Sequence, residues 1–347
     1  MRTTTLGTWP PTGRTRTSRT SAENTDPREL EITTETRPYV PPAHIVGSGA
    51  HKVIVLHSLF AGHESFSPWW PHLDGTRFSY AFMDARGFGD AIDVAGAYTC
   101  DEIASDVLLL ADSLGWREFS LIGHSLGGMP VQQVVLKAPE RVRTLVGLSP
   151  APANGLGIPD AAYPLLAEAA HKVENRRIIF DSSTGGKLSP HWVASWAEQS
   201  MRAVGPDAFR GCLDSVNTPD FSAEITGAPL PALVVVGEND PATNADTMNQ
   251  TWMRHYPSGQ LAVIGNAGHH QMVETPIALA TLVERFLGDW RERGGLVLQT
   301  PEETVLVVAA CLLPANRFEH ARCLYRKEER RFPMRLIYSE LWMTVCM

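Results

Sequence analysis

The most informative stretch of the sequence is residues 123–127 (GHSLG), which has the pattern G-x-S-x-G. It follows an apolar segment at 118–122 and precedes a helical pattern at 126–138, so we expect it at a turn from a strand into a helix. Small residues flanking Ser125 permit the sharp turn that lifts its hydroxyl off the sheet and puts the Leu126 N–H beside it. Ser125 is therefore a candidate nucleophile, although glycines also close strand–helix turns that carry no chemistry.

A serine hydroxyl needs a base, and the base needs an acid to orient it. Two downstream loops supply both in the order typical of this strand–turn–helix arrangement. Asp240 follows an apolar strand at 233–236, and His269 follows another at 261–264. Both loops lie at carboxyl ends of predicted parallel strands, where active sites collect. We predict Ser125 as nucleophile, Asp240 as acid and His269 as base, with Glu238 and His270 as their nearest competitors.

The elements that position these residues alternate along the chain. Short apolar strands are predicted at 52–56, 78–83, 118–122, 142–148, 233–236 and 261–264, and helices at 101–114, 126–138, 245–256 and 276–291. This alternation is typical of a mostly parallel, doubly wound α/β sheet with helices on both faces. Asp101 and Pro276 are suitable helix-start residues.

The strand rhythm stops between residues 150 and 226, where the sequence becomes helical and aromatic. We predict a helical cap there, inserted after the strand that follows the nucleophile helix. Its aromatic residues either pack the insertion or line the substrate site; they are Phe180, Trp192, Trp196 and Phe209. The α/β domain is expected at 37–293, between a disordered extension at 1–36 rich in Thr, Arg, Pro and Ser and a C-terminal extension at 294–347 of unknown structure.

Composition limits the function classes. A net charge of −8 disfavours a nucleic-acid-binding protein, and no apolar run has the length of a membrane span. Five widely spaced cysteines without a C-x-x-C pair suggest neither a disulfide framework nor zinc. We find no metal-ligand set and no phosphate loop, so we expect no metal and no cofactor.

The expected location is a reducing, cytoplasmic compartment. Residues 1–21 contain four Arg and no acidic residue, so a mitochondrial transit peptide is the alternative. The oligomeric state does not follow from the sequence.

Three further segments make the sequence resemble the α/β-hydrolase superfamily, in its esterase, lactonase and carbon–carbon hydrolase branch, over about residues 39–291. Residues 53–58 (VIVLHS) resemble the family's strand ending in His-Gly, residues 84–89 (DARGFG) match its D-x-R-G-x-G turn, and Gly268-His269 with Glu274 and Pro276 matches its closing G-H…E-x-P. The resemblance implies the α/β-hydrolase fold.

The resemblance also implies an oxyanion hole. Leu126 supplies one backbone N–H and Leu59 the second, with Phe60 as a neighbouring possibility. Ser58 stands where the family usually has Gly, whose backbone adopts strained angles more readily, and this difference puts the oxyanion geometry in doubt. His57 is expected to support this loop by hydrogen bonds.

The remaining expectations concern nearby side chains. Arg86 is expected to be structural, and His124 is expected to point away from Ser125. Trp69 and Trp70 fit either the pocket or the core, whereas Phe60, Trp192 and Trp196 are expected to contact substrate.

The predicted reaction is hydrolysis of a small to medium carboxylic ester or lactone through an acyl-enzyme. By this resemblance, epoxide hydrolases and haloalkane dehalogenases, which share the fold, have Asp at the position of Ser125 in the G-x-S-x-G turn. Ser125 therefore argues against both. Alternatives that keep the same three residues are a carbon–carbon bond hydrolase, a cofactor-free perhydrolase and a non-catalytic ligand-binding protein of the same fold.

Overall fold

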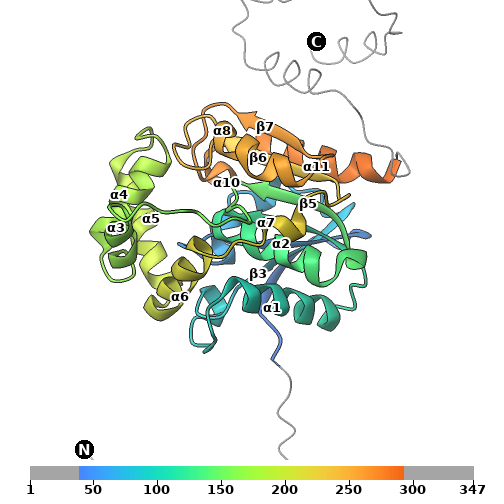
Figure 1. Ribbon diagram of the computed structural model, residues 1–347, viewed down its shortest axis with the longest axis horizontal. Coiled ribbons are helices and arrows are strands. Elements are labelled where there is room, and N and C mark those ends of the chain that lie inside the picture. Colours follow the sequence, from blue (N-terminus) through green and yellow to red (C-terminus); the bar gives the residue numbers. More distant parts are fainter. Residues whose placement is uncertain (1–38, 293–347) are drawn as a thin grey trace, which may run out of the picture. The chain divides into compact units, whose positions relative to one another are not determined.

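A seven-stranded sheet with the order β1-β3-β2-β4-β5-β6-β7 organises the chain (Figure 1). The computed structural model describes residues 39–292, and the expectations for 1–36 and 294–347 lie outside this range. Only the β1–β3 pair is antiparallel; the other five pairs are parallel. The strands are β1 (Ala43–Val46), β2 (His51–Leu56), β3 (Phe78–Met83), β4 (Phe119–His124), β5 (Val142–Leu148), β6 (Ala232–Gly237) and β7 (Gln260–Ile264).

Six of the seven strands coincide with the predicted apolar runs. Strands β3, β4 and β6 are buried along their whole length, which explains their continuous apolar sequences. Strand β1 was not predicted, because its four residues are partly exposed at the sheet edge and are too few to show a pattern. The predicted fold class is confirmed.

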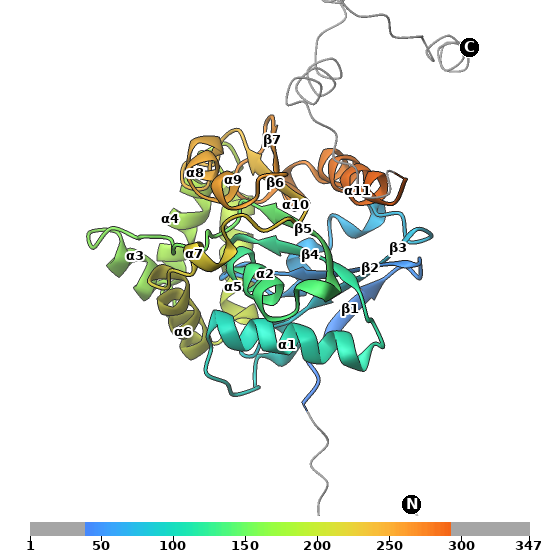
Figure 2. The same cartoon turned by 45° about the vertical axis from the view of Figure 1, so that its right-hand side comes forward.

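Helices cover both faces of this sheet. Side chains of β2 point alternately into two apolar cores. Ile54 and Leu56 pack in the core shared with α1 (Cys100–Ser113) and α2 (Gly128–Lys137). Val53 and Val55 pack in the core shared with α11 (Pro276–Glu292). Figure 2 shows α1 and α2 on one side of the strands and α11 on the other. Short 3₁₀ turns occur at His63–Phe66, Trp70–His72, Gly89–Ala91, Ser125–Gly127 and Pro139–Arg141.

Two local expectations were wrong. Helix α1 begins before Asp101, and its N-cap is Thr99, whose side chain accepts a hydrogen bond from the Glu102 N–H. The helix predicted at 245–256 is two short helices, α8 (Ala245–Gln250) and α9 (Trp252–His255), interrupted at Thr251. Trp252 is fully buried and its indole N–H donates to Ala151 O at 3.2 Å, a tertiary contact that overrides helical propensity.

The predicted helical insertion lies between β5 and β6. It comprises α3 (Tyr163–Glu168), α4 (Val173–Ser183), α5 (Pro190–Ala203), α6 (Pro206–Asn217) and α7 (Ser222–Ile225). Helix α5 begins with an N-cap bond from the Trp192 N–H to Ser189 Oγ, followed by Pro190, which suits a first helical position. Helices α3 to α6 gather beyond one end of the strands in Figure 1.

Two of the cysteines, Cys100 and Cys212, lie in the described range, and both are buried free thiols. In residues 39–292 no helix combines the length and apolarity that crossing a membrane requires.

Candidate active site

Ser125 lies at the sharp turn between β4 and α2. Its φ of +53° is in the left-handed region, which is uncommon and unfavourable for a non-glycine residue. A Cβ on Gly123 would lie 2.3 Å from Gly127 O, and a Cβ on Gly127 would lie 2.8 Å from Leu56 O. Ser125 is partly exposed although the residues on both sides are buried. The close backbone approaches thus explain the G-x-S-x-G pattern, and the turn presents the serine hydroxyl.

The predicted acid and base meet at the ends of β6 and β7. His269 Nδ1 donates a hydrogen bond to Asp240 Oδ2 at 2.7 Å, which leaves Nε2 as the nitrogen able to accept a proton. Asp240 also accepts bonds from the N–H groups of Ala242 and Thr243, both at 3.0 Å, and from Thr243 Oγ1 at 2.6 Å. These contacts fix the carboxylate and, through it, the imidazole.

The electrostatics of this pair favour a charged acid beside a basic imidazole. Burial opposes ionisation of Asp240, but the facing His269 and hydrogen bonds from His269, Thr243 and Ser149 outweigh it and hold the pKa of Asp240 well below its usual range. Burial also opposes protonation of His269, yet the charge and hydrogen bond of Asp240 raise the pKa of His269 above its ordinary value. The imidazole is therefore suited to hold a proton transiently.

The loop that carries His269 is closed by a carboxylate. Glu274, in α10 (Gln271–Glu274), accepts the N–H of Gly268 at 2.8 Å and the N–H of His270 at 2.9 Å. The N–H of His269 itself donates to Ser183 O in the cap at 2.9 Å. The G-H…E-x-P motif is thus a loop clamp, and the cap shares in holding the imidazole.

The His124 side chain contacts the loop that carries His269. Its Nε2 donates to His269 O at 2.9 Å, and its ring is 5.1 Å from that of His269, so it links the Ser125 turn to the His269 loop. Burial lowers the pKa of His124 to about 3, which keeps the ring neutral. In the described part of the chain, no hydrogen bond joins Ser125 Oγ to His269; such contacts often tighten only when substrate binds.

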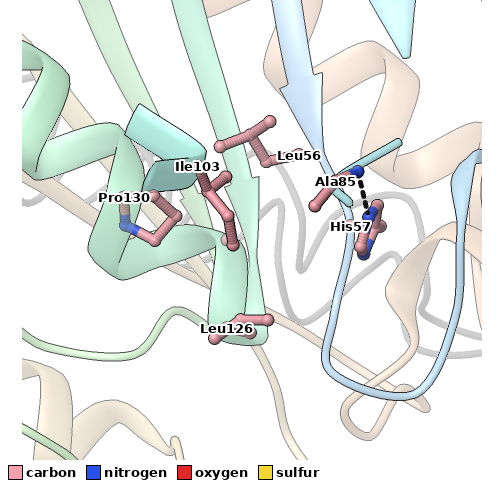
Figure 3. A pocket seen from close by; sticks show the side chains of 7 residues that line it. Leu56, His57, Ala85, Ile103, Leu126 and Pro130 are labelled. Atoms are coloured by element: carbon pink, nitrogen blue, oxygen red, sulfur yellow. Dashed lines mark hydrogen bonds between the residues drawn. The ribbon is translucent and has the colours of Figure 1, made fainter. Parts of the chain in front are cut away.

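The segment after β2 faces the turn that carries Ser125. His57 Nδ1 donates to Ser58 O at 2.8 Å. The Ala85 N–H donates to His57 Nε2 at 3.1 Å (Figure 3), so this ring braces the loop. Ser58 is not at positive φ, so the glycine of the family pattern is not required there. The Phe60 N–H donates to Ser58 Oγ at 3.4 Å, which favours Leu59 as the oxyanion donor. A small cavity lies beside this segment and the Ser125 turn, and it is lined by Leu56, His57, Ala85, Ile103, Leu126, Gly127 and Pro130.

Aromatic side chains of the cap face the loop that carries His269 and His270. Trp192 and Trp196 stack with ring centroids 5.2 Å apart, and each is 6.2 Å from the ring of His270. Phe180 lies 5.4 Å from both His270 and Phe60. The residues expected to contact substrate therefore belong to one aromatic cluster next to the predicted base.

Two polar residues next to Asp240 were missed by the sequence reading. Thr243 bonds the carboxylate through both its N–H and its hydroxyl, and its position three residues after an Asp is a recognisable local turn signal. Ser149, at the end of β5, is buried with φ +42° and accepts a bond from Gln271 Nε2 at 2.7 Å. No local pattern marks Ser149, because its partners are distant in sequence.

Other singled-out residues are structural. Arg86 forms a two-pronged pair with buried Asp106, at 2.8 and 2.9 Å. Trp69 is fully buried in the core on the α11 face. His63, Asp84 and Asp90 lie close enough to suggest a cation site, but Asp84 already accepts bonds from the His63 ring, the His63 N–H and the Asp90 N–H. This group therefore ties loops together.

The choice of acid gives a first prediction. Asp240 is 3% exposed and bonded to His269, whereas Glu238 is exposed and accepts only the Asn266 N–H among the bonds described for residues 39–292. We expect Asp240→Asn to lower kcat by roughly 10⁴, by analogy with other triads. Glu238→Gln is the matched control on the same loop and should stay near wild type. Similar, mild losses in steady-state turnover of an aryl ester by both variants would refute the assignment.

The raised pKa of His269 gives a second prediction, on pH dependence. The imidazole must be neutral to accept a proton, so kcat/KM should fall as pH drops through the pKa of His269. In Asp240→Asn the carboxylate charge is lost, so the midpoint of this acid limb should move to lower pH. Profiles from about pH 5 to about pH 9 for both proteins provide the measurement. A midpoint that stays in place or moves to higher pH would argue against His269 as the base.

Comparison with known proteins places this geometry in context. The family described as the alpha/beta hydrolase fold matches residues 52–276, more than half of the 347-residue chain. A pimeloyl-[acyl-carrier protein] methyl ester esterase of Nitrosomonas europaea is 28% identical over 214 residues, which cover 58% of this chain and 81% of the relative. The 3-oxoadipate enol-lactonase 2 of Acinetobacter baylyi is 25% identical over 211 residues, covering 58% and 75%. The structure of a thermophilic esterase from Thermogutta terrifontis superposes with a TM-score of 0.62 at 21% identity, covering 72% and 93%.

Proposed function

The chain belongs to the α/β-hydrolase family, and from this premise we propose that it is a serine hydrolase of small to medium carboxylic esters or lactones. One observation carries the proposal. A strained, partly exposed Ser125 and a hydrogen-bonded His269–Asp240 pair all follow the carboxyl ends of strands in the same sheet. A strained serine at a strand–helix turn is costly unless its hydroxyl has a use.

The proposed mechanism uses these groups in turn. His269 Nε2 takes the proton of Ser125 as Oγ attacks the substrate carbonyl, and the N–H groups of Leu126 and Leu59 bind the oxyanion. The alcohol leaves with the proton from His269, giving an acyl-enzyme on Ser125. Water, deprotonated by His269, then attacks the acyl carbon, and the acid is released as Ser125 regains its proton. Asp240 stabilises the imidazolium at each stage.

The substrate class rests on two kinds of support. The curated relatives reported above are named as an ester hydrolase and a lactonase, and both reactions cleave a bond at an acyl carbonyl, which a serine nucleophile can attack. The aromatic cluster of Phe60, Trp192 and Trp196 offers an apolar wall for an acyl or alcohol group.

Turnover assays test this function directly. Purified protein is assayed on 4-nitrophenyl esters of graded acyl length and on five- and six-membered lactones. We expect measurable kcat/KM for at least one ester series, with an optimum at short to medium length. If Ser125 reacts with a fluorophosphonate but no ester or lactone is turned over, the bond cleaved is of another kind, and a carbon–carbon bond hydrolase becomes the favoured reading.

A further inference from the structure

Helix α4 of the cap buries an arginine that has no acidic partner. Arg176 is 0% exposed, its Nε donates to Ala169 O at 2.7 Å, and its Nη1 donates to Ser200 Oγ at 2.6 Å. Its Nη2 is itself buried and has no hydrogen-bond partner in residues 39–292, and no carboxylate of that range influences the ionisation of Arg176. The guanidinium is thus partly satisfied as a hydrogen-bond donor and unpaired as a charge.

A buried, unpaired positive charge is expensive to maintain. Burial lowers the pKa of Arg176 to about 10, so the side chain still carries its charge near neutral pH. The nearby aromatic rings offset only part of this cost: Cζ lies 4.9 Å from the ring centroid of Phe209 and 5.9 Å from that of Phe60. An anion supplied from outside the chain would complete the set of interactions.

The arginine lies next to the proposed substrate wall. Ser200 Oγ, which accepts from Arg176, donates to Phe60 O at 2.5 Å, and Phe60 directly follows the predicted oxyanion donor Leu59. Phe180 is four residues after Arg176 on α4 and therefore on the same helix face. Because Phe180 contacts both Phe60 and His270, this face of the cap is directed at the catalytic loops.

We propose that the substrate of the proposed hydrolase carries a carboxylate on its acyl part, and that Arg176 binds this carboxylate through Nη2. One guanidinium supplies one positive charge, which matches one carboxylate. Phe60 contacts both the Arg176 guanidinium and Phe180, so a short methylene chain between the carboxylate and the reacting carbonyl would meet aromatic side chains. The substrate class is then the half-ester of a short dicarboxylic acid, or a lactone bearing a carboxylate, and Arg176 determines specificity.

Kinetics on a charged and a neutral ester of equal length test the proposal. Mono-4-nitrophenyl glutarate and 4-nitrophenyl pentanoate differ mainly in the terminal carboxylate. Wild-type protein should have the higher kcat/KM for the glutarate half-ester. In Arg176→Met the ratio of the two kcat/KM values should fall by about tenfold to a hundredfold, mainly through KM, as expected for the loss of a charge-assisted hydrogen bond.

The neighbouring arginine provides a matched control. Arg177 is on the same helix, but its side chain is 41% exposed and pairs with exposed Glu198 at 3.2 Å. Arg177→Met removes the same charge from the protein surface and should leave the glutarate preference as in wild type. Arg176→Lys keeps a positive charge without the planar group, so it should retain part of the preference and also serves if Arg176→Met does not fold.

Binding separates this proposal from the assignment of Ser125. Calorimetric titration of the Ser125→Ala protein with monomethyl glutarate and with methyl pentanoate needs no turnover. We expect tighter binding of the charged ester, and loss of that difference when Arg176→Met is added. If esters are not hydrolysed but this difference is found, the hydrolase assignment fails and the carboxylate site stands. If wild type shows no preference, or Arg176→Met and Arg177→Met keep the same ratio, the arginine is structural and the proposal is overturned.

Discussion

Replacing Ser125 by Ala should lower kcat on an activated aryl ester by a factor on the order of 10⁶, leaving only the residual rate that the rest of the site provides. The reason is chemical, because no other atom at the turn can form the acyl-enzyme. The backbone reason points the same way: alanine at φ +53° has the same steric restriction as serine, so the substitution changes the hydroxyl and little else.

Steady-state kinetics with matched thermal unfolding provide the test. Ser113→Ala is a suitable control, since Ser113 is an exposed residue at the end of α1 whose hydroxyl bonds only Leu110 O among the described contacts. Both variants should unfold close to the wild-type temperature. A Ser125→Ala protein that keeps a tenth of wild-type kcat would show that the nucleophile is another group.

The adjacent histidines His269 and His270 should respond very differently to substitution. His269→Ala removes the group bonded to Asp240 and should lower kcat by about as much as loss of the nucleophile, because the two act as a unit. His270 faces the cap aromatics, and burial holds its pKa well below its ordinary value. His270→Ala should therefore alter mainly KM, through the shape of the aromatic wall.

The two variants are compared on one aryl ester at the optimum pH, with kcat and KM measured separately. The expected pattern is a collapse of kcat in His269→Ala and a change in KM with kcat largely preserved in His270→Ala. A severe loss of kcat in His270→Ala together with near-normal His269→Ala would reverse the assignment of the base.

Features that depend on short-range sequence patterns could be predicted from the sequence. The apolar runs of β2 to β7 predicted a parallel sheet, and the flanking glycines predicted the turn at Ser125, because backbone contacts there leave no room for a Cβ. Asp240 and His269 were chosen from their positions after two strands, and the structure brings them into hydrogen-bond contact.

Features that depend on tertiary contacts could not be predicted from the sequence. Ser149 reaches Gln271 across 122 residues, and nothing in its neighbourhood marks it. The break at Thr251 follows from the burial of Trp252, which helical periodicity cannot express. Arg176 and Arg177 are neighbours in a polar stretch that is typical of a solvent-exposed surface. Only the packing of α4 buries Arg176 and leaves Arg177 partly exposed. The sequence thus predicted which residues meet at the candidate site better than it predicted the residues that support them.

The central claim is that Ser125 is a reactive nucleophile activated by His269. The most direct measurement is reaction of the purified protein with a fluorophosphonate, followed by intact-mass analysis and peptide mapping. The account predicts a single adduct on Ser125, with fluoride displaced by Oγ, no adduct in Ser125→Ala, and slow labelling in His269→Ala. Unlabelled wild-type protein, or an adduct that maps to another residue and persists in Ser125→Ala, would contradict it.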